Sequence, residues 1–283
     1  MVPFKIDLSG KTAVVTGGGG VLCSAFAGAL AECGAAVAVL DLNAGAAEAV
    51  ASRIRENGGK AIAVPCSVLD RASLEEAKET VLREFGGIDI LLNGAGGNNP
   101  RATTDCETAD LPDPAPGAPP LKTFFDLDPE GVSFVFGLNF LGTLLPTQVF
   151  AKEMMNRDAV IINVSSMNAY RPLTKIPAYS AAKAAVSNFT QWLAVHFAPA
   201  GIRVNAIAPG FFSTAQNRAL LFNEDGTPTA RTGKILAATP MKRFGQPEEL
   251  LGALLFLTDN RASGFVTGTV LPVDGGFQAY SGV

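Results

Sequence analysis

Short apolar runs rich in β-branched residues alternate with helical stretches through the first third of the chain. The apolar runs predict buried strands at 12–16, 35–41, 60–65 and 88–93. The intervening stretches predict helices from Gly20 to about residue 34, at 44–57 and at 71–85. Strands that each feed a helix before the next strand build a parallel sheet with helices on both faces. The alternation therefore predicts a doubly wound α/β fold in three layers.

A proline-rich stretch interrupts this alternation at about 96–127. Six prolines stand there among acidic and small residues, which favours a long loop over a helix or a strand. A loop of this length inside a compact domain is usually functional or disordered. Its position directly after a strand favours an active-site lid.

The rest of the chain returns to regular elements. The pattern predicts, in order, a helix from about 128 to 157, a strand at 160–165, a helix at 178–198, a strand at 202–207, an irregular segment at 209–245, a helix at 248–258 and a strand at 270–273. The sheet would then have seven strands. Because the sequence shows no internal repeat and no linker, we expect residues 1–283 to form a single domain.

Composition excludes several classes of function. A net charge of −4 and a pI near 5.1 argue against a general nucleic-acid binder. Four cysteines without a CxxC pair favour reduced thiols in the cytosol over disulfides or a zinc site. The one histidine, His196, lies in an apolar run where a structural role is favoured, so neither a Ser-His-Asp triad nor a metal site is expected. The N-terminus lacks the pattern of a signal peptide, and we expect a cytoplasmic protein.

One stretch raises the question of a membrane. Residues 131–151 carry no charge and are long enough to cross a bilayer. They also contain polar side chains such as Asn139 and Gln148, which are costly in lipid. We therefore expect a buried or interface helix.

Four glycines, Gly17 to Gly20, separate the first strand from the first helix. Glycines there permit a tight turn and the close approach of a dinucleotide pyrophosphate to the helix N-terminus. Asp41 ends the second strand, 24 residues after Gly17, where a carboxylate accepts hydrogen bonds from ribose hydroxyls. It would repel a 2′-phosphate, and no Lys or Arg stands in the loop or just after Asp41, which favours NAD over NADP. The alternative is an acid that starts a turn before Asn43.

Tyr179 and Lys183 are four residues apart, so they share one face of the predicted helix. A phenol titrates near 10, and a nearby ammonium group lowers that pKa. The pair is a candidate acid/base device, although the spacing alone proves little.

Together these features resemble the short-chain dehydrogenase/reductase family over essentially the whole chain. That family carries a Thr-Gly-x-x-x-Gly-x-Gly loop, Asn-Asn-Ala-Gly after the fourth strand, a helical Asn, a Ser thirteen residues before a Tyr, and Tyr-x-x-x-Lys. The matching residues are Thr16-Gly17, Asn93-Gly94-Ala95-Gly96, Asn139, Ser166, Tyr179, Lys183 and Pro209-Gly210. The resemblance implies a Rossmann-type fold and an NAD(P)-dependent oxidoreductase that acts on a CH–OH group.

Three positions depart from the family pattern. Val21 and Cys23 stand where the loop has its second and third glycines, and Gly94 replaces the second asparagine. We expect Asn93 and backbone bonds to hold the loop after the fourth strand instead. Ser67 stands where the family usually has an aspartate that faces the adenine, which predicts looser adenine discrimination.

The resemblance also implies roles for individual residues. Tyr179 would exchange the proton of the substrate hydroxyl, Lys183 would lower the pKa of Tyr179 and bind the nicotinamide ribose, and Ser166 would hydrogen-bond the reacting oxygen. Asn139 would hold a water that links Lys183 to solvent; it could also mark a helix kink, and both can be true. The implied cofactor contacts are Gly17, Gly19, Gly20, Val21, Leu22, Asp41, Ser67, Val68, Asn93, Gly94, Ala95, Tyr179, Lys183, Pro209 and Phe212.

Within the family, the proline-rich insertion and the run Ser166-Met167-Asn168 are most similar to the D-mannonate oxidoreductase branch, which interconverts D-mannonate and D-fructuronate. A sugar acid needs a cation for its carboxylate, and an arginine fork suits it best. The candidate cations are Arg101 and Arg171, with Lys175 nearby. The candidates for its hydroxyls are Asn98, Asn99 and Asn168. Each could equally be a solvated loop residue.

Three further expectations complete the interpretation. Gln216, Asn217 and Arg218 belong to a segment expected to close over the substrate. Other substrates, such as gluconate or a 3-oxoacyl thioester, and a non-catalytic dinucleotide-sensing protein stay open as alternatives. The long apolar helices favour self-association, and the resemblance implies a homotetramer, with a homodimer as the alternative.

Overall fold

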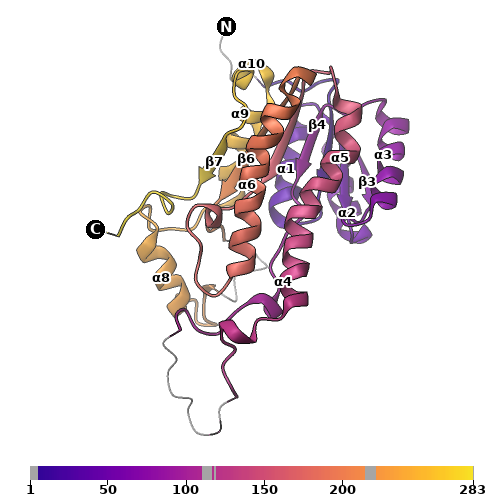
Figure 1. Cartoon of the computed structure of the whole chain (residues 1–283). Helices are drawn as coiled ribbons and strands as arrows, with labels where there is room; N and C mark the ends of the chain where they lie inside the picture. Colours follow the sequence, from indigo (N-terminus) through magenta and orange to yellow (C-terminus); the bar gives the residue numbers. More distant parts are fainter. Residues whose placement is uncertain (1–5, 110–116, 118, 214–220, 283) are drawn as a thin grey trace.

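Seven parallel strands form one sheet at the centre of the computed structural model, which describes residues 6–109, 117, 119–213 and 221–282 (Figure 1). The strands are β1 (Thr12–Thr16), β2 (Ala36–Asp41), β3 (Lys60–Pro65), β4 (Ile90–Asn93), β5 (Ala159–Val164), β6 (Ile202–Pro209) and β7 (Val270–Val273). Their order is β3-β2-β1-β4-β5-β6-β7, and all neighbours are parallel. The predicted seven-stranded, doubly wound sheet is confirmed.

Helices cover both faces of this sheet. They are α1 (Val21–Glu32), α2 (Ala44–Glu56), α3 (Arg71–Phe85), α4 (Pro129–Phe136), α5 (Gly142–Met154), α6 (Pro177–Phe197), α8 (Ala230–Ala238), α9 (Leu251–Thr258) and α10 (Asn260–Ser263). One buried cluster lies between the sheet and α1, α2 and α9, and a second lies between the sheet and α3, α5 and α6. The chain therefore has the three predicted layers.

Most predicted elements lie where the sequence placed them, with two corrections. The segment predicted as irregular at 209–245 contains α8, whose N-cap Thr229 accepts a hydrogen bond from the Thr232 amide. The long apolar helix is interrupted by a π turn, Gly137–Leu141, which separates α4 from α5. Periodicity alone did not reveal this turn, because the apolar pattern continues through it.

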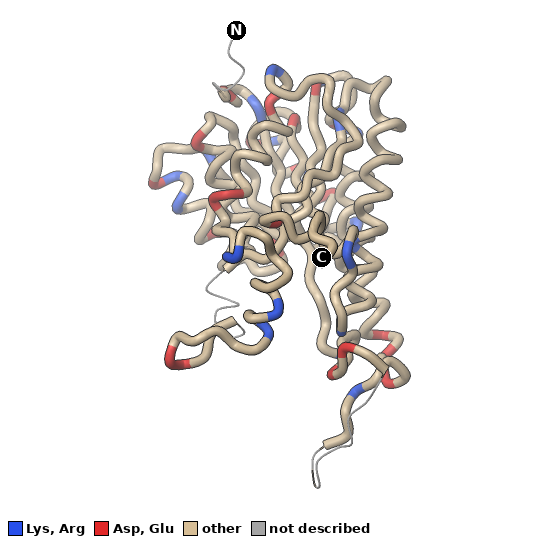
Figure 2. Tube along the Cα trace, turned by 90° about the vertical axis from the view of Figure 1, so that its left-hand side faces the viewer, with Lys and Arg blue, Asp and Glu red and all other residues tan. Residues whose placement is uncertain are grey.

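The proline-rich insertion is anchored where it is described. It contains two short 3₁₀ turns, Pro100–Ala102 and Phe124–Asp126. The Thr104 amide donates to the Lys175 carbonyl at 2.9 Å, and Lys234 on α8 forms an ion pair with Glu107 at 2.7 Å. The insertion and α8 both extend from the same end of the molecule (Figures 1 and 2).

The apolar segment Pro129–Met154 is the one helical stretch in the described part of the chain with the length and composition of a membrane span. Half of its most apolar window is buried inside the protein. Val149, Phe150 and Met154 on α5 belong to the cluster beneath the sheet. This placement agrees with the expected buried or interface helix.

Candidate active site

The strand order reverses between β1 and β4, where the chain leaves one half of the sheet for the other. In doubly wound sheets, ligands bind beyond the carboxyl ends of the strands at this point. A cavity of about 220 Å³ opens there. Its lining residues are Leu22, Gly94, Gly96, Gly97, Val164, Ser165, Ser166, Tyr179, Lys183, Pro209 and Gly210.

Tyr179 and Ser166 both line this cavity. Ser166 follows β5 and caps the short turn Met167–Ala169, where its Oγ accepts from the Asn168 amide at 3.2 Å. Tyr179 lies in the first turn of α6. Burial raises the pKa of Tyr179, while a hydrogen bond with Ser166 lowers it by less. The net shift of the Tyr179 pKa is therefore upward, and the expected lowering by Lys183 together with an oxidised cofactor stays a prediction.

Lys183 lies one turn after Tyr179 and is 4 % exposed. Its Nζ donates to the Val164 carbonyl at 2.8 Å and stands 5.8 Å from the centroid of the Tyr179 ring. Because burial disfavours the charged form, it lowers the pKa of Lys183 to about 8. The ammonium group is thus held at the cavity wall with two of its three donors left for other partners.

Asn139 sits inside the π turn and is fully buried. Its Nδ2 donates to the carbonyls of Val135 and Gly97 at 2.8 and 2.7 Å, and its Oδ1 accepts from the Gly97 amide at 3.2 Å. The expected helix irregularity is therefore present as a π turn, a feature often found at functional sites. The role of Asn139 in holding a water stays a prediction.

The glycine loop between β1 and α1 has the shape that a dinucleotide needs. Gly17 has a φ of +63°, and a Cβ there would lie 2.8 Å from the Ala95 Cα, so only glycine fits. Gly20 is the N-cap of α1 and no side chain caps its amides, which leaves the helix N-terminus open to an anion.

Asp41 anchors this loop from the end of β2. Its Oδ2 accepts from the Gly19 amide at 3.0 Å, and its Oδ1 accepts from the Asn43 amide at 2.9 Å. Each carboxylate oxygen has a further lone pair for a ribose hydroxyl. The residues present therefore fit an NAD-type cofactor, with its pyrophosphate at α1 and its adenosine ribose at Asp41.

Two other predicted cofactor contacts follow β3. The Ser67 hydroxyl accepts from the Leu69 amide at 3.4 Å, so the side chain is turned into its own loop. Val68 is buried and lies against Gly142 at the start of α5. Their contact with the adenine stays a prediction.

The loop after β4 is held differently from what the sequence indicated. The Asn93 side chain points under the sheet and donates to Thr147 Oγ1 and Asn163 Oδ1 at 3.0 and 2.9 Å, so it does not hold the loop. Instead, Thr16 Oγ1 accepts from the amides of Gly94 and Ala95 at 3.1 and 3.4 Å. Thr16 was not among the predicted site residues, although it begins the Thr-Gly motif.

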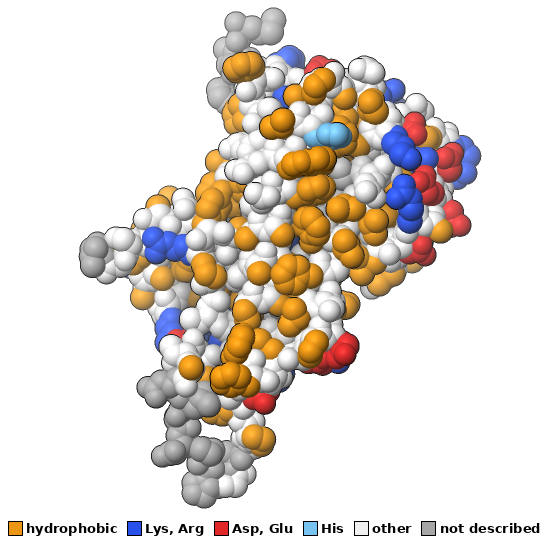
Figure 3. Space-filling model, viewed as in Figure 1, with side chains coloured by type: hydrophobic (Ala, Val, Ile, Leu, Met, Phe, Trp, Pro, Cys, Tyr) orange, Lys and Arg blue, Asp and Glu red, His pale blue; other side chains and the backbone are white. Residues whose placement is uncertain are grey.

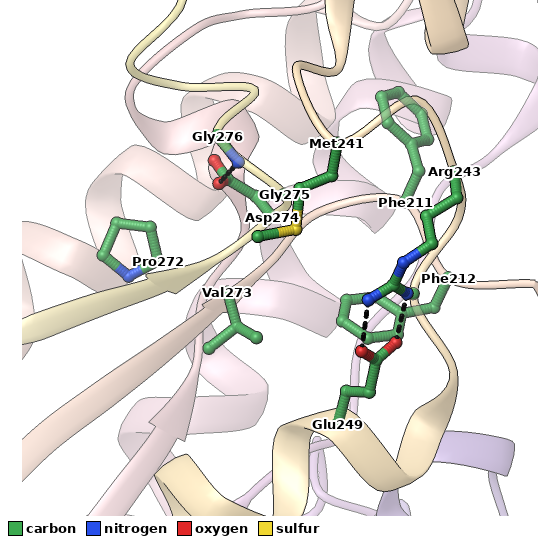
Figure 4. Close-up of a pocket in the computed structure, with 11 residues that line it drawn as sticks. Phe211, Phe212, Met241, Arg243, Glu249, Pro272, Val273, Asp274, Gly275 and Gly276 are labelled. Atoms are coloured by element: carbon green, nitrogen blue, oxygen red, sulfur yellow. Dashed lines mark hydrogen bonds and ion pairs between the residues drawn. The ribbon is translucent and has the colours of Figure 1, made fainter.

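Pro209 ends β6 and lines the catalytic cavity, whereas the Phe212 ring turns away from it. A Cβ on Gly245 would lie 2.5 Å from the Phe212 ring, so the ring packs against that glycine. The ring borders a separate hollow of about 380 Å³ beside the Arg243–Glu249 ion pair (Figure 4). The predicted cofactor contact of Phe212 stays a prediction.

The candidate cations differ in their partners. Arg101 pairs through Nε with Asp128 and through Nη2 with Glu130 at the start of α4, so it is the less available of the two candidate cations. Arg171 donates through Nε to the Gln278 carbonyl at 2.8 Å, which leaves its terminal nitrogens for another acceptor.

The candidate hydroxyl ligands also differ. Asn98 is exposed and donates to Thr103 Oγ1, and Asn99 accepts from the Arg101 amide. Asn168 is 3 % exposed, and its Oδ1 has no hydrogen-bond partner. A buried carbonyl oxygen without a donor is costly, which makes Asn168 a strong candidate to accept from a ligand hydroxyl.

Gln216, Asn217 and Arg218 lie outside the described residues. Within the ranges that the structure describes, no cluster of three or more His, Cys, Asp or Glu side chains could hold a metal ion.

Comparison with known proteins gives a consistent result. The family model for short chain dehydrogenases matches residues 11–225. An uncharacterized oxidoreductase, UxuB, of Bacillus subtilis (strain 168) is 58 % identical over 284 residues, covering 100 % of both chains. A crystal structure from Haemophilus influenzae, provisionally assigned as a D-mannonate oxidoreductase and containing NAD, is 58 % identical with a TM-score of 0.93, again over 100 % of both chains. A gluconate 5-dehydrogenase from Burkholderia cenocepacia J2315 in complex with NADP and tartrate is 31 % identical with a TM-score of 0.82, over 98 % of this chain and 99 % of the other.

Proposed function

This chain belongs to the short-chain dehydrogenase family, and on that basis we propose that it is an NAD-dependent oxidoreductase that interconverts D-mannonate and D-fructuronate. The observation that carries the proposal is the cavity that brings Ser166, Tyr179 and Lys183 together at the switch point of the sheet. The full-length identity of 58 % to the NAD-containing Haemophilus structure supports the choice of substrate.

The chain's own residues supply the proton chemistry. NAD, when bound, supplies the hydride chemistry and, in its oxidised form, a positively charged ring. Tyr179 takes the proton of the substrate hydroxyl during oxidation and returns it during reduction. Without substrate, the hydrogen bond of Ser166 lowers the pKa of Tyr179. With substrate bound, the single hydroxyl hydrogen of Ser166 is donated to the reacting oxygen, where negative charge develops.

Lys183 is the positive charge that this proton transfer needs. Its Nζ is fixed by the Val164 carbonyl beside the Tyr179 ring, with two donors left for a ribose hydroxyl and a water. Asn139 holds the backbone of Gly97 next to this ammonium group. We propose that it also positions the water that connects Lys183 with solvent.

Substrate binding would use the loop between Ser166 and Tyr179. Arg171 has a fork available for a carboxylate, and the buried Oδ1 of Asn168 needs a donor, which a sugar hydroxyl provides. Arg171→Ala should raise KM for D-fructuronate by about tenfold or more, while Arg101→Ala, whose guanidinium is paired with Asp128 and Glu130, should change it by less than about twofold. If Arg101→Ala raised KM more than Arg171→Ala, Arg171 would not be the residue that binds the carboxylate.

The deciding experiment is a spectrophotometric assay of the purified protein with a panel of hexonates and with NAD or NADP. We expect kcat/KM to be highest for D-mannonate and D-fructuronate with NAD(H). A preference for gluconate or 5-ketogluconate, or for a 3-oxoacyl thioester, would keep the enzyme class and replace the substrate. Cofactor binding without turnover on any of them would favour a dinucleotide-sensing protein.

A second line of the proposal concerns the protein's state in the cell. We propose a cytoplasmic homo-oligomer, a tetramer or a dimer, that associates through the face of α4, α5 and α6. This face exposes large apolar side chains, and Trp192 stacks between Phe189 and His196 along α6. Figure 3 shows orange side chains along α6 and its neighbours, with the charged side chains towards the margins of this view.

A further inference from the structure

Two departures from the family pattern, Cys23 and Gly94, meet in space. Cys23 is buried in the first turn of α1, and Gly94 follows β4 directly. A Cβ added to Gly94 would lie 2.2 Å from the Cys23 Sγ, far inside van der Waals contact. The same Cβ would lie 2.9 Å from the Thr16 carbonyl oxygen and 3.1 Å from a Leu92 methyl group, so the Cys23 sulfur is the nearest of three groups that fill the room at position 94.

The turn 94–97 that begins at Gly94 connects the cofactor loop with the catalytic residues. On one side, Thr16 Oγ1 accepts from two of its amides. On the other, Asn139 binds both the amide and the carbonyl of Gly97. A Cβ on Gly96 would lie 2.7 Å from Asn139 Oδ1 and 3.1 Å from Lys183 Nζ, so the turn touches the catalytic pair directly.

Packing at Gly94 therefore sets where this turn lies relative to the ammonium group of Lys183. We propose that Cys23 is a positioning residue, matched to Gly94, whose sulfur fixes the turn 94–97 between the dinucleotide loop and the Asn139–Lys183 pair. Close-packed interiors transmit a change of one heavy atom to their neighbours. A misplacement of about 1 Å at a reacting centre can cost on the order of a hundredfold in rate.

The thiol acts through its volume. Burial raises the pKa of Cys23 to about 12, so the group stays protonated and unreactive at neutral pH. The inference depends on dinucleotide binding, which the family establishes, and does not depend on which sugar acid is the substrate.

The test moves one heavy atom from position 23 to position 94. Cys23→Ala leaves a void, and Gly94→Ala overfills the same space. Cys23→Ala/Gly94→Ala removes the clash with the sulfur and leaves the closer approach to the Thr16 carbonyl oxygen. For each, the dissociation constant for NADH is measured by fluorescence titration, together with kcat and KM for whichever hexonate the wild type turns over. Gly28→Ala on α1 is the matched control, because a Cβ there meets nothing within 4 Å.

We expect Gly94→Ala to weaken NADH binding by about tenfold or more and to lower kcat. The double variant should bind NADH more tightly than Gly94→Ala, although it carries a second substitution. The Tm of each variant, measured without ligand, distinguishes a loss of packing stability from a displaced turn.

For Cys23→Ala, a lowered kcat of the folded protein supports the positioning role. A lowered Tm with unchanged kcat and unchanged NADH affinity overturns it. A double variant no tighter than Gly94→Ala overturns the matched pair. If NADH binds but no hexonate reacts, the proposed substrate fails while the binding data still decide this inference.

Discussion

Lys183 shows how burial and function compete at one residue. Its side chain is almost fully enclosed, and burial lowers its pKa from the ordinary value of 10.5 to about 8. The same burial raises the pKa of Tyr179. Both shifts oppose the charged pair that proton transfer uses, so the ligand-free site holds its ammonium group at a cost. The positive charge of an oxidised cofactor would favour the Tyr179 phenolate, and the hydroxyls of its ribose would accept hydrogen bonds from the Lys183 ammonium group and offset part of its desolvation cost.

The Lys183 pKa predicts how stability depends on pH. Between about pH 8 and 10.5 the unfolded chain binds more protons at this residue than the folded protein, so the free energy of unfolding rises with pH across that window. The penalty is fully present below about pH 8 and amounts to a few kcal/mol. Urea unfolding of the ligand-free protein at several pH values from 7 to 9.5 would measure it.

Lys183→Met is the control for this pH dependence. It lacks the titrating group and also the hydrogen bond to Val164, but the loss of that bond shifts its stability by a nearly constant amount. Wild type should therefore gain stability relative to Lys183→Met as the pH rises. Parallel curves for the two proteins would contradict the lowered pKa.

Tyr179→Phe tests the acid/base assignment. The substitution removes only the hydroxyl, so we expect NADH affinity within about twofold of wild type and a kcat lowered by at least a hundredfold, roughly the range for a lost general acid or base. Ser166→Ala should lower kcat by a similar order, because it removes a donor to the reacting oxygen. Substantial turnover by Tyr179→Phe would refute the scheme.

Asp41 carries the predicted choice between NAD and NADP. Asp41→Asn removes the charge that would repel a 2′-phosphate while keeping an acceptor for the Gly19 amide, whereas Asp41→Ala removes both. We expect both variants to raise kcat/KM for NADP relative to NAD by about tenfold or more, and Asp41→Ala to bind NADH more weakly than Asp41→Asn. Equal use of both cofactors by the wild type would show that Asp41 only shapes the loop.

At the scale of elements, the π turn Gly137–Leu141 is the piece of local structure that builds the site. It turns the Asn139 amide toward Gly97, and the hydroxyls of Thr143 and Thr147 continue the hydrogen-bonded line along α5 to Asn93. The sequence analysis gave a helix kink at Asn139 as one of two interpretations. It could not show the turn's exact register, which depends on contacts with a loop some 40 residues away.

Asn139→Ala would leave the Gly97 amide and carbonyl without their partner. We expect a loss of about 1–3 kcal/mol in the free energy of unfolding, together with weaker NADH binding and a lower kcat. Thr143→Val removes only the hydroxyl bond to the Asn139 carbonyl and should cost less than about 1 kcal/mol with little change in kcat. Equal effects of the two substitutions would assign Asn139 a purely helical role.

Local signals decided which elements were predictable. Each of the first four strands is a short apolar run next to a glycine or a capping residue, and the structure places them within about two residues of the prediction. The helix α8 was not predicted because its short amphipathic pattern follows a segment that contains proline and glycine. Some side-chain contacts were not predicted for another reason, because their partners come from other parts of the chain that only the folded structure brings together. These are the contacts of Asn93, Arg101 and Cys23.

At the scale of the whole molecule, the two faces of the sheet are unequal. The layer formed by α1, α2 and α9 covers the larger buried cluster. The layer with α4, α5 and α6 turns large apolar side chains to solvent: Trp192 is 57 % exposed, and Val195 and Phe134 are 79 % and 47 % exposed. An apolar surface of this kind marks an interface when it is contiguous. The uncharged stretch 131–151 is thus apolar for two reasons: one side packs against the sheet, and the other side would pack against the proposed second copy of the chain.

Trp192→Glu tests this interface because it places a charge at the centre of the aromatic row on α6. Burying that charge against another copy would be costly, so we expect the variant to elute as a smaller species than wild type, with its mass measured by light scattering at matched concentrations. Phe265→Glu is the control: Phe265 is fully exposed after α10 and takes no part in the ring contacts of the aromatic row, so its substitution should leave the mass unchanged. The variant should still bind NADH, because its site lies at the other side of α6 around Lys183. An unchanged mass for Trp192→Glu would show that the interface does not include the aromatic row on α6. A monomeric wild type would refute the proposed self-association.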